Sequence, residues 1–171
     1  FGQHDFARFR RAIHSYRKAD LSTPRFFADI SPRPFQQRIL EALQAARQSG
    51  VNRNLVVAAT GKGKTVIAAL DYRKQVELFG RKPRLLFVVH RKEILQQAID
   101  CFRAVLRDQN FGELLVDGHL PEDWDHLFAS IQSLNINQPW ERFGHHHYEH
   151  LIVDEAHHGT ASSYRPLFDH L

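Results

Sequence analysis

The stretch "AATGKGKT", residues 58–65, most constrains what this chain can fold into, because it lies between the apolar run 55–57 and a helix-like segment. Glycines let backbone N–H groups approach an anion, and a helix that starts directly after them adds favourable potential for negative charge. A strand, a glycine-containing loop and a helix in this order are typical of a phosphate-binding loop. An ordinary glycine-containing turn is the alternative interpretation.

The chain from Pro34 onward alternates between helical and strand-like patterns. Helical spacing of apolar residues, with favourable prolines and glycines at the ends, is found over 33–50, 64–80, 93–108 and the start of 161–171. Short apolar runs predict strands over 54–59, 84–90, 126–131 and 150–156. This alternation favours an α/β fold, in which helices cover both faces of a mainly parallel sheet. We expect surface loops over 18–32, 107–125 and 137–149.

The residue types in the loop fit the chemistry of nucleotide phosphates. A lysine must reach the outer phosphates, which suits Lys64, and a hydroxyl must face Mg²⁺, which suits Thr65. The strict pattern begins with glycine, whereas Ala58 holds that position here. The residues expected to contact ATP are Thr60, Gly61, Lys62, Gly63, Lys64 and Thr65.

A second motif lies at the end of the apolar run 150–156, where two adjacent acids follow the strand-like residues. Asp154 and Glu155 come 90 residues after Lys64. In a nucleotide hydrolase the first acid can hold Mg²⁺ through its water shell and the second can polarise the attacking water. The alternative interpretation is that the two carboxylates are simply solvated at a strand end. The glycine-containing loop upstream disfavours this alternative.

"AATGKGKT" together with "VDEAHH" resembles motifs I and II of the DEAD/DEAH-type helicases and translocases of superfamily two. In these proteins alanine at the first loop position is usual. The resemblance covers about residues 32–171 and implies a RecA-like lobe that uses ATP and Mg²⁺, with catalytic roles for Lys64, Asp154 and Glu155. In particular, "SSYRPLFDHL" resembles a helix of the bacterial helicases related to restriction-enzyme helicase subunits.

Other segments match further motifs of this family. "RPFQQRIL" resembles the element beside the adenine, which implies that Arg33 and Gln36 contact ATP. "FVVHRKEILQQA" and "FASIQSL" resemble the motifs that line the nucleic-acid backbone. The contacts so implied come from His90, Arg91, Lys92, Ser130 and Gln132. His157 matches the histidine that links the ATP site to the nucleic-acid side.

The expected domain organisation has two parts, a basic N-terminal extension over 1–31 and the ATP-binding lobe over 32–171. Residues 1–25 contain six basic and two acidic side chains, and the spacing of their apolar residues predicts an amphipathic helix. The family's motif III strand and second RecA-like lobe have no counterpart in the sequence. We therefore expect these residues to be part of a longer protein, and to bind nucleotide better than they hydrolyse it.

Composition limits the location and the class of the protein. The sequence contains no apolar stretch of about 18 residues, so no membrane span is predicted. The single cysteine, Cys101, suits a reducing cytoplasm. The 12 histidines include "GHHHYEH", but its histidines straddle a loop and a strand rather than one helix face, so zinc is disfavoured.

Three functional classes remain after these considerations. The leading one is an ATP-dependent translocase or helicase on nucleic acid, DNA being favoured over RNA. A P-loop small-molecule kinase or NTPase would share the loop but not the motifs after the strands. A catalytically silent binding module is the third class, because Lys62 stands where the family loop commonly has threonine.

Overall fold

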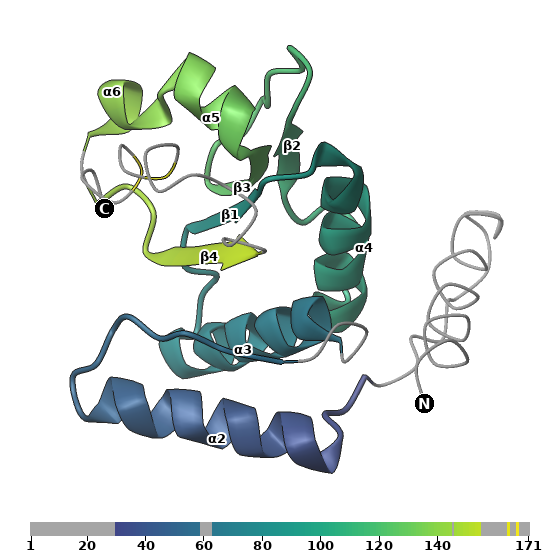
Figure 1. The fold of residues 1–171 in the computed structure, drawn as a ribbon, viewed down its shortest axis with the longest axis vertical. Helices are drawn as coiled ribbons and strands as arrows, with labels where there is room; N and C mark the ends of the chain where they lie inside the picture. The colour runs from purple at the N-terminus through teal and green to yellow at the C-terminus, as the bar shows by residue number, and fades with distance from the viewer. Residues whose placement is uncertain (1–29, 59–62, 145, 155–163, 165–166, 168–171) are drawn as a thin grey trace, which may run out of the picture.

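A computed structural model describes residues 30–58, 63–144 and 146–154 together with Tyr164 and Leu167. Its sheet is entirely parallel and has the strand order β2-β3-β1-β4 (Figure 1). The strands are β1 (Leu85–Val89), β2 (Glu113–Leu115), β3 (His126–Ser130) and β4 (His150–Asp154). The α/β fold with a parallel sheet is thus confirmed.

The register of the three longer strands aligns their ends. Val89, the last residue of β1, lies opposite Ser130 of β3 on one side and opposite Asp154 of β4 on the other. The segments that follow these strands therefore leave the sheet at one edge, here called the carboxyl edge. In parallel α/β sheets this is the edge where ligands bind.

One face of the sheet is covered by α3 (Lys64–Phe79) and α4 (Leu95–Leu106), and α2 (Pro34–Gln48) packs against α3 from outside (Figure 1). A short 3₁₀ helix, η1 (Lys92–Ile94), leads into α4. The core on this side is aromatic: Phe87, Phe102 and Phe128 are fully buried, with ring centroids 5.1 to 5.5 Å apart. Their burial fixes α4 against the sheet.

The opposite face buries the alternate residues of the same strands. Leu86, Val88, Leu127 and Ala129 form a second cluster with residues of α5 (Ile131–Asn137), and Trp140 of α6 (Pro139–Phe143) packs against it. Tyr164 and Leu167 belong to this cluster as well. The two central strands, β1 and β3, are therefore buried on both faces, which is why they are nearly continuous apolar runs, whereas β4 is only partly buried.

The prediction of a strand over 54–59 is wrong for residues 54–58, which the structure describes. Residues 51–58 form no strand, and Leu55 and Val57 are 88% and 84% exposed. An apolar run becomes a strand only where a neighbour can pair with its backbone. In the described sheet β4 pairs with β1 alone, and the run passes in front of α3, away from β4 (Figure 1). The family resemblance implies that a motif III strand lies between the apolar run 54–59 and β4 in the sheet. The presence of this strand stays a prediction.

The expected loops also need correction. The loop over 107–125 contains β2, which is only three residues long and therefore gives little periodic signal. The loop over 137–149 contains α6, and α5 was not expected at all. Both helices are shorter than the length at which apolar spacing becomes informative. The basic helix expected within residues 1–25 and most of the helix expected over 161–171 lie outside the described residues.

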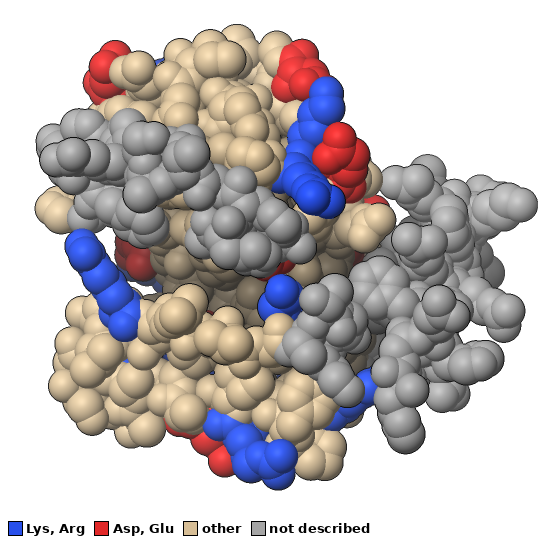
Figure 2. Space-filling model, viewed as in Figure 1, with Lys and Arg blue, Asp and Glu red and all other residues tan. Residues whose placement is uncertain are grey.

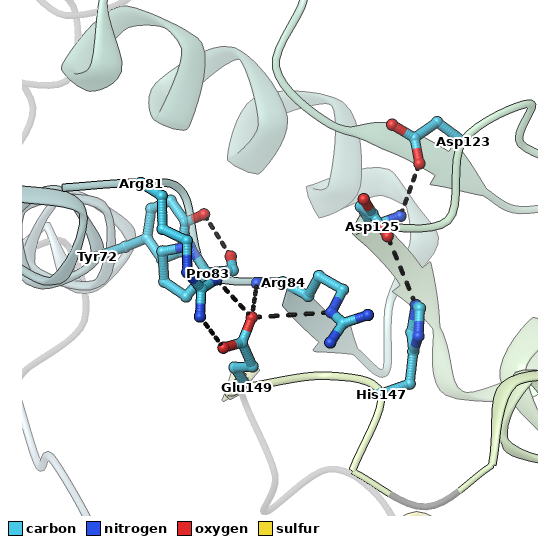
Figure 3. A network of polar contacts seen from close by, with 8 residues as sticks. All are labelled: Tyr72, Arg81, Pro83, Arg84, Asp123, Asp125, His147 and Glu149. Carbon is cyan, nitrogen blue, oxygen red and sulfur yellow. Dashed lines mark hydrogen bonds and ion pairs between the residues drawn. The ribbon is translucent and has the colours of Figure 1, made fainter. Parts of the chain in front are cut away.

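A polar network ties the starts of β1 and β4 together at the amino edge of the sheet (Figure 3). Glu149 accepts hydrogen bonds from the Arg81 side chain at 2.9 and 2.5 Å, and from the Arg84 backbone N–H at 3.0 Å. These bonds lower the pKa of Glu149 to about 2, the hydrogen bond with Arg81 being the largest cause. The network holds β4 in register with β1. This register places Asp154 opposite Val89 at the other end of the strands.

Candidate nucleotide site and nucleic-acid edge

The loop 58–65 leads into the amino end of α3, and its described end has the geometry that glycine allows. Gly63 precedes the helix with a φ of +74°, in the left-handed region that favours glycine. Lys64 and Thr65 are the first two residues of α3, and both are partly exposed. Their position at a helix amino end suits contact with an anion.

Gln36 lies against this same glycine. A Cβ added at Gly63 would lie 3.1 Å from Gln36 Nε2, so the two residues are in close approach. The other end of the amide is fixed too, because the Arg33 backbone N–H donates to Gln36 Oε1 at 2.9 Å. Gln36 is 5% exposed. The structure thus brings together two parts of the predicted ATP site that are 27 residues apart in the sequence.

Asp154 is the last residue of β4 and lies at the carboxyl edge. The amino end of α3 and the carboxyl end of β4 are on the same side of the molecule (Figure 1). A lysine, a hydroxyl and a carboxylate on these two elements are the donor types that a Mg²⁺–nucleotide needs. The residues present therefore fit Mg²⁺ and nucleotide phosphates. The other predicted site residues, Thr60, Gly61, Lys62, Glu155 and His157, lie outside the described residues.

The predicted nucleic-acid contacts after β1 lie at the carboxyl edge. Arg91 and Lys92 are exposed, whereas His90 is half-buried. Within the described part of the chain, the buried His90 Nδ1 has no hydrogen-bond partner. On the face drawn in Figure 2 the coloured Lys and Arg side chains are scattered, and several lie beside acidic ones.

The predicted contacts after β3 differ from one another. Ser130 is 4% exposed, and its hydroxyl accepts from the Ser133 backbone N–H at 3.1 Å as the N-cap of α5. It also donates to the Ser133 hydroxyl at 2.9 Å. Gln132, in contrast, is exposed in the first turn of the helix. Ser130 therefore has a capping role in the fold, and contact of either residue with nucleic acid stays a prediction.

Sequence reasoning missed the partner of Lys92. The Lys92 ammonium lies 3.0 and 2.8 Å from the two carboxylate oxygens of Asp117, in the turn after β2. This hydrogen bond is the main cause that raises the pKa of Lys92. Asp117 falls in the segment expected to be a loop, and nothing local in the sequence pairs residues 25 positions apart.

A partly buried polar cluster between α2, α3 and the start of β4 was also missed. Arg47 of α2 donates to both oxygens of Asp71 on α3, at 2.8 and 2.5 Å. His150 Nε2, at the start of β4, lies 3.8 Å from the same carboxylate. Burial lowers the pKa of His150 to about 4, so this imidazole is neutral at pH 7 and the contact is not an ion pair there. In the sequence, the aspartate within the apolar stretch "AALDY" was the signal that could have indicated this cluster.

Together, the parallel sheet, the glycine-led helix α3 and the acid at the end of β4 define a RecA-like lobe. The sequence agrees with this class, since residues 29–171 match the family described as the type III restriction enzyme, res subunit. The chain belongs to this family, and the helicase resemblance seen in the sequence is confirmed. No helix in the described ranges is long and apolar enough to cross a membrane.

Curated relatives include three proteins. The chain is 32% identical over 146 residues to a putative ATP-dependent helicase, IRC3, of Saccharomyces cerevisiae, which covers 81% of this chain and 20% of the relative. It is 30% identical over 142 residues to a putative mitochondrial ATP-dependent helicase, irc3, of Schizosaccharomyces pombe, covering 81% and 23%. The endonuclease subunit of the type I restriction enzyme EcoKI of Escherichia coli is 28% identical over 140 residues, covering 77% and 12%. The chain thus spans less than a quarter of the length of each relative.

Proposed function

We propose that this chain is the ATP-binding lobe of an ATP-dependent helicase or translocase that acts on nucleic acid, with DNA as the favoured track. The observation that carries the proposal is the close approach of Gln36 to Gly63, at the amino end of α3. It joins the element implied to lie beside the adenine to the loop implied to hold the phosphates. The relatives named as ATP-dependent helicases support the same reading.

The proposed roles of Lys64, Thr65 and Asp154 follow from their places in the fold, and that of Glu155 follows from the motif resemblance. Lys64 at the start of α3 contacts the outer phosphates, and Thr65 and Asp154 hold Mg²⁺, Asp154 through water. When bound, the metal neutralises charge on the phosphate oxygens. Glu155 orients the attacking water and accepts its proton.

Nucleic acid is proposed to cross the carboxyl edge beside Arg91, Lys92 and Gln132. All three are exposed, and they follow two neighbouring strands, β1 and β3. Contacts of this kind bind phosphates rather than base edges, so we expect little sequence preference and strong salt dependence. A second RecA-like lobe in the same protein completes the proposal, because a cation supplied from outside the loop can raise phosphoryl-transfer rates about a thousandfold or more.

The location of the protein stays open to test. The single buried cysteine, Cys101, suits a reducing compartment such as the cytoplasm. The S. pombe relative is named as mitochondrial, so the cytoplasmic location stays a prediction.

The test is ATP hydrolysis by the full-length protein, with and without single- and double-stranded DNA and RNA. The variants are Glu155→Gln and, as a matched control, Glu77→Gln, whose side chain is 68% exposed and, among the described residues, makes only a weak i,i+4 pair on α3. We expect stimulation by one nucleic acid, lost in the first variant and kept in the second. ATP turnover indifferent to nucleic acid would favour a small-molecule kinase or NTPase. ATP binding without turnover under any condition would favour a silent binding module.

A further inference from the structure

The turn after β2 carries a carboxylate to the proposed nucleic-acid edge. Residues 116–119 form a tight turn in which the His119 backbone N–H donates to Val116 O at 2.9 Å. Asp117 and Gly118, at its centre, have φ of +51° and +78°, which is the pattern of a type I′ turn. Aspartate is one of the few residues with a side chain that adopt this conformation readily. The carboxylate therefore starts from a defined backbone position rather than from a long open loop.

The contact that this turn makes bridges distant parts of the sheet. Lys92 follows β1, and Asp117 follows β2, which are separated in the sheet by β3. The Lys92 ammonium contacts both carboxylate oxygens, at 3.0 and 2.8 Å, which is the arrangement it would make with two phosphate oxygens. Both side chains remain solvent-exposed, at 52% and 65%. Such a pair is held weakly in water and can exchange partners.

We propose that Asp117 is a built-in competitor of the nucleic-acid phosphate at Lys92, so that binding of the nucleic-acid backbone at this edge must displace the Asp117 carboxylate. This inference rests on the proposed function, because it takes Lys92 to be a phosphate contact. The ligand is a polyanionic backbone, recognised by charge alone. The consequence is a lower affinity that lets the lobe release its track more readily.

The size of the effect follows from the exposure of the pair. An exposed ion pair is worth little, so removing the competing carboxylate should raise affinity by about two- to fivefold. Lys92 contacts a phosphate in the bound state with or without Asp117, so the number of neutralised phosphates is the same. The slope of log K against log salt concentration should therefore stay nearly unchanged.

The main variant is Asp117→Asn in the full-length protein, and the chain offers a matched control at the other edge of the sheet. Asp108 forms a similar partly exposed ion pair with Lys82, which precedes β1. A five-residue strand separates the two edges by about 16 Å, which exceeds the screening length of about 8 Å at physiological salt. Asp108→Asn therefore removes the same charge without removing the proposed competitor.

The measurement is binding of a fluorescent single-stranded oligonucleotide over a range of salt concentrations. We expect tighter binding with a nearly unchanged salt slope in Asp117→Asn, and no gain in affinity in Asp108→Asn. In a double-mutant cycle the gain should disappear when Lys92→Gln is also present. A gain that persists in the double variant, or an equal gain in the control, would overturn the proposal, since net charge would then explain it.

Two other outcomes separate the inference from the function on which it rests. Weaker binding of Asp117→Asn would show that the carboxylate positions Lys92 rather than competing with phosphate, and it would overturn the inference alone. No binding of any nucleic acid by the unaltered protein, with ATP still bound, would overturn the proposed function and the inference together.

Discussion

Gly112→Ala should destabilise the fold strongly, because the site has neither the backbone freedom nor the space for a side chain. Gly112 has a φ of +72°, and a Cβ there would lie 2.7 Å from Phe128 Cε2 and 3.3 Å from His126 O. Relaxation is restricted, since Arg103 of α4 donates to the carbonyl oxygens of Phe111 and Gly112, at 2.8 and 2.9 Å. The new methyl group would therefore push a buried ring of the core.

Two costs add at this position. Left-handed backbone costs an ordinary residue about 1–2 kcal/mol, and forcing an extra methyl into a packed core costs about 1–3 kcal/mol. The expected loss in the free energy of unfolding is therefore about 3 kcal/mol. Gly118→Ala is the matched control, because Gly118 flanks β2 on its other side with a φ of +78° and nothing within 4 Å of its Cβ position. It should lose only the backbone part, about 1 kcal/mol.

Urea unfolding followed by fluorescence of Trp124 and Trp140 measures both variants. With an m-value of about 2 kcal/mol/M, the midpoint should fall by about 1.5 M for Gly112→Ala and by about 0.5 M for Gly118→Ala. Equal shifts would refute the reasoning, because the contact with Phe128 would then contribute nothing.

Two further predictions concern His150 and Gln36. The pKa of His150 is about 4 in the fold and near 6.5 when unfolded, so the unfolded chain binds more protons between these pH values. Stability should therefore fall by at most about 3 kcal/mol as pH drops through this window, and urea unfolding of His150→Phe should lack that loss. Gln36→Ala should weaken nucleotide binding about three- to tenfold by calorimetry, as expected for a lost hydrogen bond near Gly63. Gln37→Ala is its control, because that side chain bonds only the exposed Glu41 among the described residues, and equal losses would count against a specific role.

The helices were predictable to the extent that their signals are local. α2 begins at Pro34 and ends just before Gly50, and α3 ends before Gly80, both glycines having positive φ. Proline at a first turn and glycine past a last turn act through the backbone of a few residues. β1 and β3 were found for a related reason, since strands buried on both faces are continuous apolar runs. β4 is only partly buried, but it carries the same kind of apolar run.

Parts of the site were less predictable. The sequence indicated that Gln36 and the loop belong to one ATP site, and the structure brings Gln36 against Gly63. It did not indicate that Ser130 would be buried as a helix cap. A hydroxyl after a strand reads the same in the sequence whether it caps the next helix or faces a ligand.

The sequence by itself determined the class of the fold and the chemistry of the loop, because the spacing of apolar residues and the order of motifs are properties of short segments. Only the tertiary structure decided that Leu55 and Val57 stay exposed and that Lys92 meets Asp117. Strand pairing and ion pairing join segments far apart in the chain, and they form only where a partner lies within hydrogen-bond distance. Such partners depend on how the whole sheet is assembled, which no single segment encodes.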